Sequence, residues 1–460
     1  MWLIVVLMAN LMAADWPRFR GPNGTGVAEA KNLPVEFGKE KNLKWRVEVP
    51  GGTSSPIVSA GRIFLTAFEK DDRLLLCLDA GSGKLLWKQA TAKERTEAAH
   101  SINGPVTPTP ASDGENVYVF FPEVGLMSWD HNGKQRWKTP LGPFSSIQGL
   151  AGSPIVVDGV VVLLIDQAQG GWVAGFDAST GRQRWKAERP STVWGGYTTP
   201  LVYRPKSGPA QVIVFASLET TGYQASTGER LWWMPGLGVA PAASPSLVGE
   251  VLYTNQTYGA EISAPFSVWA AMDKNKNGKI EREEVKDAGL QRLIFGADAQ
   301  YGNNDGVLEA GEWNRFDETG RDSGGLVALQ LGGRGDLSKS APRWRVTKSV
   351  PYLTASVVYD GVLYTIRDGG ILAAIDPVKG EVLKQGRVEG ALDKYYASPV
   401  AGDGKLYLTS EAGKVAVVKA GGDWRTLAVA DLDEPAYATP ALIDGRVIVR
   451  TRKALYCFGQ

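Results

Sequence analysis

The sequence predicts an all-β protein, an eight-bladed β-propeller that carries a small α-helical insertion. Three observations lead to this fold class. Two short motifs recur along the 460 residues, and their spacing of roughly 45 residues is the length of one four-stranded blade. The two ends of the chain supply complementary parts of one repeat. The recurrence is interrupted once, by a segment rich in Asp, Asn, Glu and Gly.

The first motif is a Ser/Thr-Pro step that opens an apolar run followed by an Asp/Gly turn. Residues 154–164, for example, read as two strands joined by an Asp-Gly hairpin turn. Proline suits the first residue of a strand, where the sheet needs no N–H donor. The motif occurs at Ser55-Pro56, Thr109-Pro110, Ser153-Pro154, Thr199-Pro200, Ser244-Pro245, Ser398-Pro399 and Thr439-Pro440, with Ser356-Val357 as a variant between the fifth and sixth.

The second motif closes each unit with a strand, a glycine turn that usually contains Asp, and a strand that usually bears Trp. A large ring in each blade is expected to pack between neighbouring sheets and fix their angle. We interpret these tryptophans as structural, because a ligand site is used once whereas they recur in nearly every unit. The motif covers residues 79–87, 130–137, 177–185, 225–232 and 376–383, together with Trp344 and Trp424.

The two chain ends complete one blade between them. Trp45 lies in a closing strand that no unit precedes, and the last unit, which ends at Gln460, has no closing strand after it. Pairing these ends closes the ring and removes its exposed sheet edges. The count is then eight opening motifs and eight outer strands, and seven blades would leave one motif unexplained.

The closure Asp-x-x-(Thr/Ser)-Gly-(Lys/Arg)-x-x-Trp resembles the pyrroloquinoline-quinone (PQQ) repeat. This repeat is found in quinoprotein dehydrogenases and in the propeller lipoprotein of the outer-membrane β-barrel assembly machine. Residues 15–24 also look like the start of bacterial PQQ-repeat proteins of unassigned role. The resemblance implies a PQQ-repeat propeller over nearly the whole chain outside the insertion. It implies no particular activity, because one fold hosts many functions.

The centre of the insertion matches an EF-hand calcium loop position by position. The loop alternates oxygen-bearing side chains, turns sharply at Gly278 and ends in a glutamate that can bind Ca²⁺ through both oxygens. The expected ligands are Asp273, Asn275, Asn277, Lys279 through its carbonyl, Glu281 and Glu284. Apolar residues flank the loop at helical spacing, namely Val268, Trp269, Met272, Val285, Ala288 and Leu293. The alternative is a solvated Asn/Asp-rich surface loop.

A second, weaker loop follows, with expected ligands Asp298, Asn303, Asp305, Val307 and Glu312. Tyr301 occupies its first position, and Asp298 lies three residues earlier. Either a lengthened loop recruits Asp298, or this half is only a structural partner of the first loop. Because the first loop has few carboxylates, we expect calcium affinity in the extracellular range, on the order of 10⁻⁴–10⁻³ M. The calcium would then be a structural clip.

Segments just before each Ser/Thr-Pro step should converge around one mouth of the central channel, where propellers commonly bind ligands. They contain the candidate binding residues His100, Gln148, Trp194, Tyr197, Tyr352, Tyr395, Tyr396 and Tyr437. These residues either bind a ligand or pack the loops against one another, and the sequence leaves both interpretations open.

The N-terminal segment indicates export. Residues 3–13 are too few to span a bilayer, which takes about 20 residues, but they suit a signal peptide. The balanced charge, 50 basic and 49 acidic residues, gives no basic footprint for nucleic acid. We expect a periplasmic or secreted monomer without a membrane span. The predicted organisation is a signal peptide (1–14), an N-terminal extension (15–42), two propeller parts (43–261 and 323–460) and the EF-hand insertion (262–322).

The expected function is non-catalytic binding or scaffolding in the cell envelope, with calcium as the cofactor and a protein, peptide or polysaccharide as the partner. The alternative is a PQQ-dependent quinoprotein dehydrogenase acting on alcohols or sugars. The resemblance implies that such an enzyme uses adjacent cysteines against the quinone. Cys77 and Cys457 are the two cysteines and are far apart, so we expect two buried thiols rather than a disulfide and do not expect PQQ.

Overall fold

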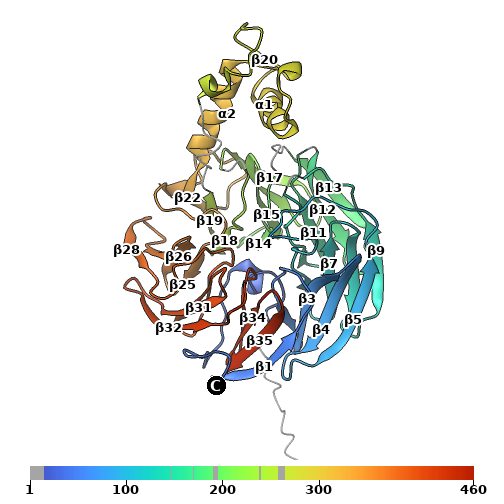
Figure 1. The fold of residues 1–460 in the computed structure, drawn as a ribbon, viewed down its shortest axis with the longest axis vertical. Coiled ribbons are helices and arrows are strands. Elements are labelled where there is room, and N and C mark those ends of the chain that lie inside the picture. The colour runs from blue at the N-terminus through green and yellow to red at the C-terminus, as the bar shows by residue number, and fades with distance from the viewer. Residues whose placement is uncertain (1–14, 147, 169, 190–194, 238–239, 257–264) are drawn as a thin grey trace, which may run out of the picture.

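The computed structural model describes residues 15–460 except 147, 169, 190–194, 238–239 and 257–264; the side chains of eleven helical residues are also outside it (288–289, 292–293, 300 and 318–323). The predicted signal peptide and Trp194 therefore lie outside the described residues. Eight sheets surround a central axis, as the eight-bladed prediction requires (Figure 1). The fold class is confirmed.

Each blade consists of four antiparallel strands; the innermost strand comes first in the sequence in seven blades, and in the eighth the outermost strand comes from the N-terminal end. The strands of the first four blades are β2 (Ile57–Ser59), β3 (Arg62–Glu69), β4 (Asp72–Asp79) and β5 (Leu85–Ala92); β6 (Ala111–Ser112), β7 (Asn116–Phe121), β8 (Gly125–Asp130) and β9 (Gln135–Pro140); β10 (Ile155–Val157), β11 (Val160–Ile165), β12 (Gly171–Asp177) and β13 (Gln183–Arg189); and β14 (Leu201–Tyr203), β15 (Gln211–Ala216), β16 (Glu219–Gln224) and β17 (Arg230–Pro235).

The strands of blades 5 to 8 are β18 (Ser246–Val248), β19 (Val251–Gln256), β22 (Gly325–Gln330) and β24 (Pro342–Val346); β25 (Val357–Tyr359), β26 (Val362–Arg367), β27 (Ile371–Ile375) and β28 (Val382–Arg387); β29 (Val400–Gly402), β30 (Lys405–Thr409), β31 (Lys414–Lys419) and β32 (Arg425–Asp431); and β33 (Ala441–Ile443), β34 (Arg446–Arg450), β35 (Ala454–Gly459) and β1 (Leu43–Glu48). A short strand from blade 5, β23 (Gly335–Asp336), joins the outer edge of blade 4 in parallel with β17.

Blade 8 is the predicted composite of the two chain ends. β1 pairs antiparallel with β35, and Trp45 lies opposite Cys457 in this pair. The hydrophobic core fills the spaces between adjacent sheets; one cluster joins the inner faces of blades 3 and 4, from Ile155 to Ala225. The ring is therefore closed by backbone hydrogen bonds at its seam and by apolar packing at the other junctions.

A ring of hydrogen bonds joins the blades at their inner ends. The Ser or Thr hydroxyl of the first motif accepts a hydrogen bond from the backbone N–H of the equivalent residue in the preceding blade, at 2.9–3.1 Å. The acceptors are Thr109, Ser153, Thr199, Ser244, Ser398, Thr439 and Ser55. The motif thus carries a structural hydroxyl, which fixes each inner strand to the next.

The eighth junction lacks this hydroxyl, and here the sequence interpretation was one residue off. Val357 lies opposite Tyr364 as Ile57 lies opposite Phe64, so Ala355, not Ser356, occupies the hydroxyl position. The buried guanidinium of Arg20 crosses this junction instead. It donates to the Pro245 carbonyl (3.3 Å), the Ser246 hydroxyl (3.2 Å) and the Ser356 carbonyl.

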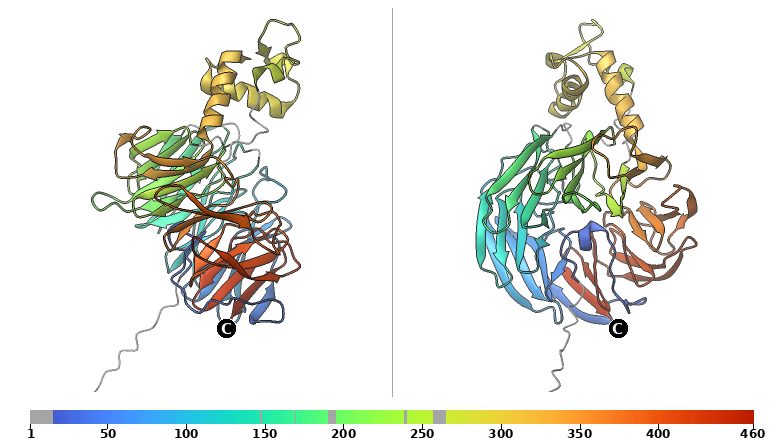
Figure 2. Two further views of the ribbon diagram at one scale, coloured as in Figure 1. Left: turned by 90° about the vertical axis from the view of Figure 1, so that its left-hand side faces the viewer. Right: turned by 180° about the vertical axis from the view of Figure 1, so that it is seen from behind.

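Residues 15–42, which we call the strap, run through the channel and touch most of the inner strands. Trp16 pairs with Val58 through two backbone hydrogen bonds (2.8 and 2.9 Å), and the Asn23 amide makes two bonds to Val202 (2.7 and 3.0 Å). Further along, Ala28 N–H donates to Ala401 O (2.9 Å). The short helix η1 (Pro22–Gly24) of the strap, drawn in blue, lies near the centre of the ring (Figures 1 and 2). The first part of the strap therefore lies at the centre of the ring, whereas Lys31 and Leu33 contact the turns of blades 8 and 7.

At the outer side, tryptophans join the blades as predicted. The indole N–H of Trp45, Trp87, Trp137, Trp185 and Trp344 donates to a carbonyl of the next blade at 2.9–3.4 Å. Each ring also covers the turn glycine of that blade, where an added Cβ would lie 2.5–3.0 Å from the indole. These glycines, Gly83, Gly133, Gly181, Gly228 and Gly380, have φ between 72° and 87°. Glycine is thus required both by the backbone conformation and by the ring.

Three blades depart from this pattern. Trp232 donates to Gln211 Oε1 of its own blade (2.8 Å). In blade 6 Lys384 stands at the Trp position, and its Nζ donates to the Trp424 carbonyl (2.7 Å). Trp424 precedes its strand, and Ala428 occupies the equivalent register, so the assignment of Trp424 as a closing tryptophan was wrong. The bulge in this pair, between Val417 and Val418, is the one that the other blades also have, so blade 7 differs by its residue and not by its register.

The hydroxyl ring can be tested with Thr199→Val, which keeps the shape of the side chain but removes the acceptor of the Ser153 N–H. Because this donor is buried, we expect the free energy of unfolding to fall by about 1–2 kcal/mol. Denaturant titration followed by tryptophan fluorescence measures the change. The converse variant, Ala355→Ser, supplies the eighth hydroxyl and is expected to leave the free energy of unfolding unchanged or higher. An equal fall in both variants would contradict the role given to the ring.

The tryptophan contact can be tested with two glycines of equal conformation. Gly181 and Gly159 both have φ of 72°, but only at Gly181 would the new Cβ meet the Trp137 ring, at 2.5 Å. Positive φ costs an alanine roughly 1–2 kcal/mol in either variant. We therefore expect Gly181→Ala to lower the free energy of unfolding by clearly more than Gly159→Ala. Equal losses would show that the ring does not require glycine.

Candidate functional site

The inserted segment leaves the propeller at the end where the channel mouth lies. β19 runs antiparallel to β18, with Ser246 opposite Tyr253, so the end of β19 lies beside the Ser244-Pro245 step. The segment projects from the ring and returns as β22 (Figures 1 and 2). Its elements are η2 (Phe266–Trp269), β20 (Ile280–Glu281), η3 (Arg282–Glu284), α1 (Ala288–Tyr301), β21 (Val307–Leu308) and α2 (Ala310–Ser323).

The first loop, residues 273–284, arranges its oxygen atoms around the turn at Gly278. Asp273 Oδ2 accepts a hydrogen bond from Gly278 N (2.8 Å), and Asp273 Oδ1 accepts from Asn277 N (3.1 Å). Glu284 folds back over the loop and accepts from Lys274 N (2.8 Å) and Glu281 N (3.0 Å). These backbone donors, that of Glu281 first, lower the pKa of Glu284 to about 2. Both ends of the loop thus present a carboxylate to the same turn.

The remaining expected ligands of this loop are held by bonds within it. Asn275 Oδ1 accepts from Asn277 N (3.0 Å) and Asn277 Oδ1 from Lys279 N (2.9 Å). Glu281 accepts from the side-chain amides of Asn275 (3.1 Å) and Asn277 (2.6 Å). The helices differ from expectation, because only the short 3-10 turn η2 is described before the loop and α1 begins at Ala288, after the turn η3.

The second loop has the same hydrogen bonds, and Asp298 takes the part of Asp273. Asp298 Oδ2 accepts from Gly306 N (2.9 Å), as Asp273 Oδ2 accepts from Gly278 N (2.8 Å). Glu312 Oε2 accepts from Glu309 N (2.9 Å), as Glu284 accepts from Glu281 N. Asn303 Oδ1 accepts from Asp305 N (3.1 Å), and Asp305 Oδ1 accepts from Val307 N (2.9 Å). Of the two alternatives that the sequence left open, this geometry matches the lengthened loop, residues 298–312.

The two loops are joined by a two-residue antiparallel ladder. Ile280 lies opposite Leu308, and both side chains are fully buried. They pack in a small core with Ile294, Phe295, Trp313 and Phe316. Among the described residues no three His, Cys, Asp or Glu side chains converge on one point. Each loop instead combines carboxylates with amide and backbone oxygens, which is the donor chemistry that Ca²⁺ accepts.

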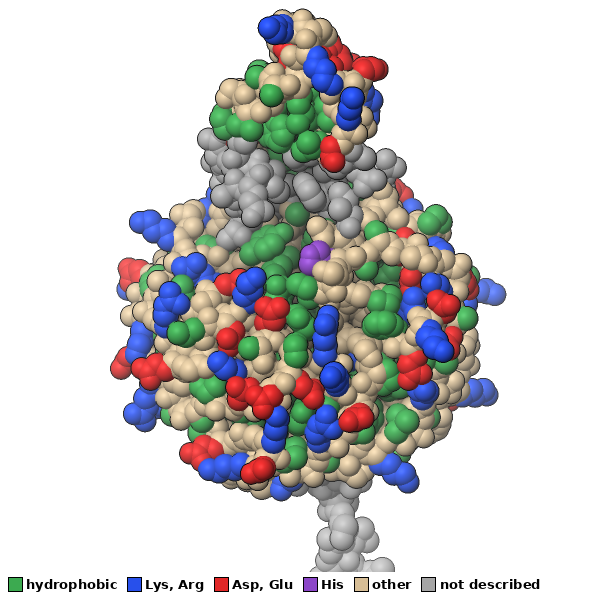
Figure 3. Space-filling view, viewed as in Figure 1, with side chains coloured by type: hydrophobic (Ala, Val, Ile, Leu, Met, Phe, Trp, Pro, Cys, Tyr) green, Lys and Arg blue, Asp and Glu red, His purple; other side chains and the backbone are tan. Residues whose placement is uncertain are grey.

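The candidate residues at the mouth fall into separate groups. His100 is exposed, and its backbone N–H donates to the Gln148 carbonyl (2.9 Å). The rings of Tyr396 and Tyr437 lie 5.5 Å apart and are tilted by 59°, whereas Tyr352 is 45% exposed and Tyr197 half-buried. Tyr395 is buried and donates to the Ala391 carbonyl (2.7 Å), so it packs a loop. Hydrophobic side chains gather near the centre of this face, and charges of both signs surround them (Figure 3).

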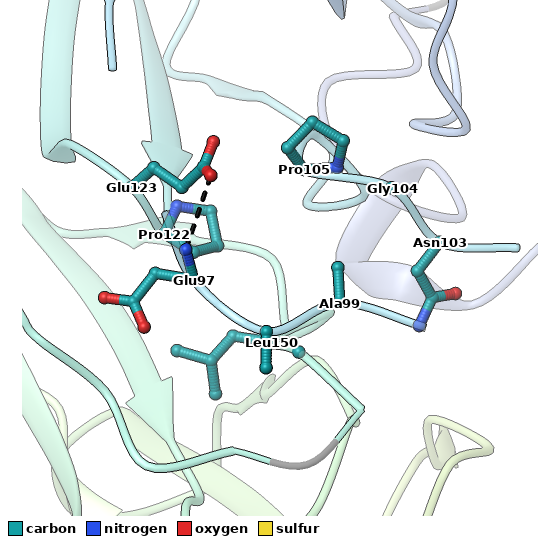
Figure 4. Close-up of a pocket in the computed structure, with 10 residues that line it drawn as sticks. Glu97, Ala99, Asn103, Gly104, Pro105, Pro122, Glu123 and Leu150 are labelled. Carbon is teal, nitrogen blue, oxygen red and sulfur yellow. Dashed lines mark hydrogen bonds between the residues drawn. The ribbon is translucent and has the colours of Figure 1, made fainter. Parts of the chain in front are cut away.

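A small pocket between the first three blades is lined by carboxylates that already have partners. Figure 4 shows the Glu123 carboxylate next to the backbone of Glu97, whose own carboxylate points away from it; Glu97 N donates to Glu123 Oε1 (3.4 Å). Glu123 is buried and forms an ion pair with buried Arg73. Glu97 accepts from Arg95 Nε and from Phe144 N (3.2 Å). These contacts fix the long loop between β5 and β6 and leave the carboxylates a structural role.

The structure adds a residue at the mouth that the sequence analysis missed. Asp166 follows β11 and is 2% exposed. Its Oδ2 accepts from Ser217 N (2.6 Å), and burial raises its pKa, which Arg189 partly opposes. The sequence feature that could have pointed to Asp166 is its position directly after an uninterrupted apolar strand, Val160–Ile165. A turn residue gives the same signal, so sequence alone does not separate the two.

Both cysteines are free thiols, as expected. They lie on blades 1 and 8, and burial raises the pKa of Cys77 to about 12 and that of Cys457 to about 11. Such thiols stay protonated and react slowly at neutral pH.

Comparisons with known proteins agree with this fold. Residues 27–143 and 70–235 match the PQQ_2 family profile, described as outer membrane protein assembly factor BamB. The sequence is 32% identical over 124 residues to the quinohemoprotein alcohol dehydrogenase ADH IIB of Pseudomonas putida. That stretch covers 24% of this chain and 17% of the enzyme. The chain thus matches less than a fifth of the length of this curated relative.

Two solved structures illustrate the likeness. BamB from Moraxella catarrhalis superposes with a TM-score of 0.53 at 11% identity, over 91% of this chain and 99% of that one. The quinohemoprotein alcohol dehydrogenase from Comamonas testosteroni gives 0.61 at 12% identity, over 97% of this chain and 80% of the enzyme. At this identity the likeness shows the fold alone. The protein is therefore an eight-bladed β-propeller of the PQQ-repeat type, similar in fold to BamB and to quinohemoprotein alcohol dehydrogenases.

Within the described residues, no helix is both long enough and apolar enough to cross a membrane.

Proposed function

We propose that this protein is a non-catalytic binding or scaffold propeller of the cell envelope, periplasmic or secreted, whose inserted segment binds calcium through an EF-hand pair. Its two kinds of relative, an assembly factor and alcohol dehydrogenases, leave both a binding and a catalytic role to be weighed. The observation that favours binding is the strap. Arg18 and Arg20 lie fully buried in the channel and donate to the carbonyls of Pro200, Pro245 and Ser356.

The residues present do not fit the quinone chemistry that the resemblance implies. Quinoprotein dehydrogenases of that kind hold an adjacent-cysteine disulfide against the cofactor. Here the thiols belong to different blades and are buried among apolar side chains, Cys77 opposite Phe64 and Trp87. We therefore assign no step to PQQ. The exposed part of the mouth, around Tyr352, Tyr396 and Tyr437, is the proposed contact surface for a protein, peptide or polysaccharide.

The calcium proposal is supported by the repeated position of one aspartate. Asp273 and Asp298 each hold the N–H of the turn glycine through Oδ2, and Glu284 and Glu312 each close the loop from the other end. With Asp298 and Asp305, the second loop carries two aspartates and one closing glutamate. It has at least as many carboxylate ligands as the first, so we propose that both loops bind Ca²⁺. Because Ile280 and Leu308 join the loops, occupation of one is expected to order the other.

Calcium binding can be tested by calorimetric titration of the purified protein. We expect two equivalents of Ca²⁺ for the wild type and fewer for Asp273→Ala and Asp298→Ala, because each variant removes the carboxylate that anchors one loop. Each affected site is expected to weaken at least tenfold. Glu283→Gln, which changes an exposed glutamate outside the ligand positions, is the matched control and should keep both equivalents. An unchanged isotherm in Asp298→Ala would restrict the proposal to the first loop.

The non-catalytic assignment is tested by mixing the protein with PQQ and Ca²⁺. We expect no shift of the quinone absorbance and no reduction of an electron-accepting dye when alcohols or sugars are added. The wild type is compared with Asp273→Ala/Asp298→Ala, in which calcium can no longer enter the insertion. Turnover in both proteins would overturn the assignment and point to a cofactor at the mouth that is independent of the loops.

A further inference from the structure

One carboxylate of the propeller is buried without a full set of partners. Asp166 Oδ1 is the one carboxylate oxygen among the described buried side-chain atoms that has no hydrogen-bond partner. A buried polar group is normally paired, so an unpaired one calls for an explanation such as a bound ion or water. The side chain is 2% exposed, which excludes bulk solvent as its partner.

A second unpaired oxygen lies next to it on the neighbouring blade. Ser217 N donates to Asp166 Oδ2 (2.6 Å), and the buried Ser217 Oγ lies close enough to lower the pKa of this carboxylate but makes no hydrogen bond of good geometry. The backbone of Gly196 also lies close to the Asp166 carboxylate, because a Cβ added to Gly196 would lie 2.3 Å from Asp166 Oδ2. Gly195 has the same constraint, since its Cβ would lie 2.2 Å from the Asp166 carbonyl oxygen. Asp166 is therefore held in place at the junction of blades 3 and 4.

Among the residues that the structure describes, no cation is hydrogen-bonded to this carboxylate. Arg189 is the cation whose charge acts on it, but its guanidinium donates to Thr221 Oγ1 (3.0 Å), Tyr223 OH (3.0 Å) and Glu219 O (2.8 Å). A buried carboxylate without a paired charge is costly. A buried water could fill the space between the two oxygens, but it would not neutralise the charge.

We propose that Asp166 Oδ1 and Ser217 Oγ form a buried binding site for one monovalent cation, Na⁺ or K⁺, at the mouth end of blades 3 and 4. Both atoms are hard oxygens, which suit such an ion and do not attract an anion. When Asp166 is ionised the site carries one formal negative charge, which a single positive charge matches, and a bound cation would oppose the rise that burial causes in the pKa of Asp166. Calcium sites commonly collect six to eight oxygens and several carboxylates. The cation would tie two blades together beside the proposed contact surface.

The site can be tested by thermal unfolding in the presence of EGTA, so that the calcium loops stay empty. At constant ionic strength the wild type is compared in Na⁺, K⁺ and tetraethylammonium, which is too large to enter. We expect Na⁺ or K⁺ to raise the melting temperature saturably by several degrees over tetraethylammonium, as expected for a ligand that binds the folded state. Equal melting temperatures in all three salts would overturn the proposal and favour a water.

Variants and crystals make the test specific. Asp166→Asn, nearly isosteric but neutral, should lose the cation effect, and Ser217→Ala should weaken the apparent affinity several-fold even if Asp166→Asn does not fold. Asp158→Asn, on the same blade and exposed, should keep the full effect. Crystals grown with Rb⁺ should show anomalous density between the two oxygens. Stabilisation by Ca²⁺ that survives Asp273→Ala/Asp298→Ala but disappears in Asp166→Asn would contradict a monovalent site.

Discussion

The architecture depends on one repeated contact, the hydrogen bond from a backbone N–H of one blade to a Ser or Thr hydroxyl of the next. Eight sheets share a centre only if their inner strands keep a constant offset, and these short bonds set that offset at seven junctions. Farther out, an indole and a turn glycine repeat the link at five junctions. At most junctions the blades are thus held at two radii, and apolar packing fills the space between. The junction of blades 5 and 6 lacks the hydroxyl and uses Arg20 of the strap.

The two ends of blade 5 differ from those of the other blades. Its third strand, β22, comes only after the inserted segment. At its inner end, the Arg20 guanidinium makes the contact to blade 6 that a hydroxyl makes at the other junctions. A single residue, Gly324, separates α2 from β22. The proposed calcium loops are therefore attached to a sheet strand by a short connection, close to the mouth. A metal that orders Glu312 at the start of α2 acts on a helix that continues almost directly into the propeller.

The sequence was sufficient for the fold because periodic motifs report on a periodic structure. The Ser/Thr-Pro step and the Trp-bearing strand each recur often enough to be counted, and the composite blade follows from the ends that remain. Errors arose where the repeat is imperfect. The sequence predicts the repeated hydroxyl at Ser356, but Ala355 occupies that position. It predicts a closing tryptophan at Trp424, but Ala428 occupies that register. Asp166 could not be found in this way, because its importance lies in a missing partner, and partners come from other blades. Asp298 was recognised only as one of two alternatives, since its distance to Gly306 depends on how the end of α1 turns.

The strap also constrains the order in which the chain can fold. It is synthesised before every blade, yet it bonds to Val202, Ala401 and Asp403, and Lys31 bonds to Gly445. β1 likewise can pair only after β35, near the opposite terminus, has been synthesised. The strap and β1 thus remain without some of their native neighbours until nearly the last strand exists, and such long-range pairings slow folding. Assembly of the ring and filling of its channel are consequently late events, and a chain interrupted before blade 8 can complete neither.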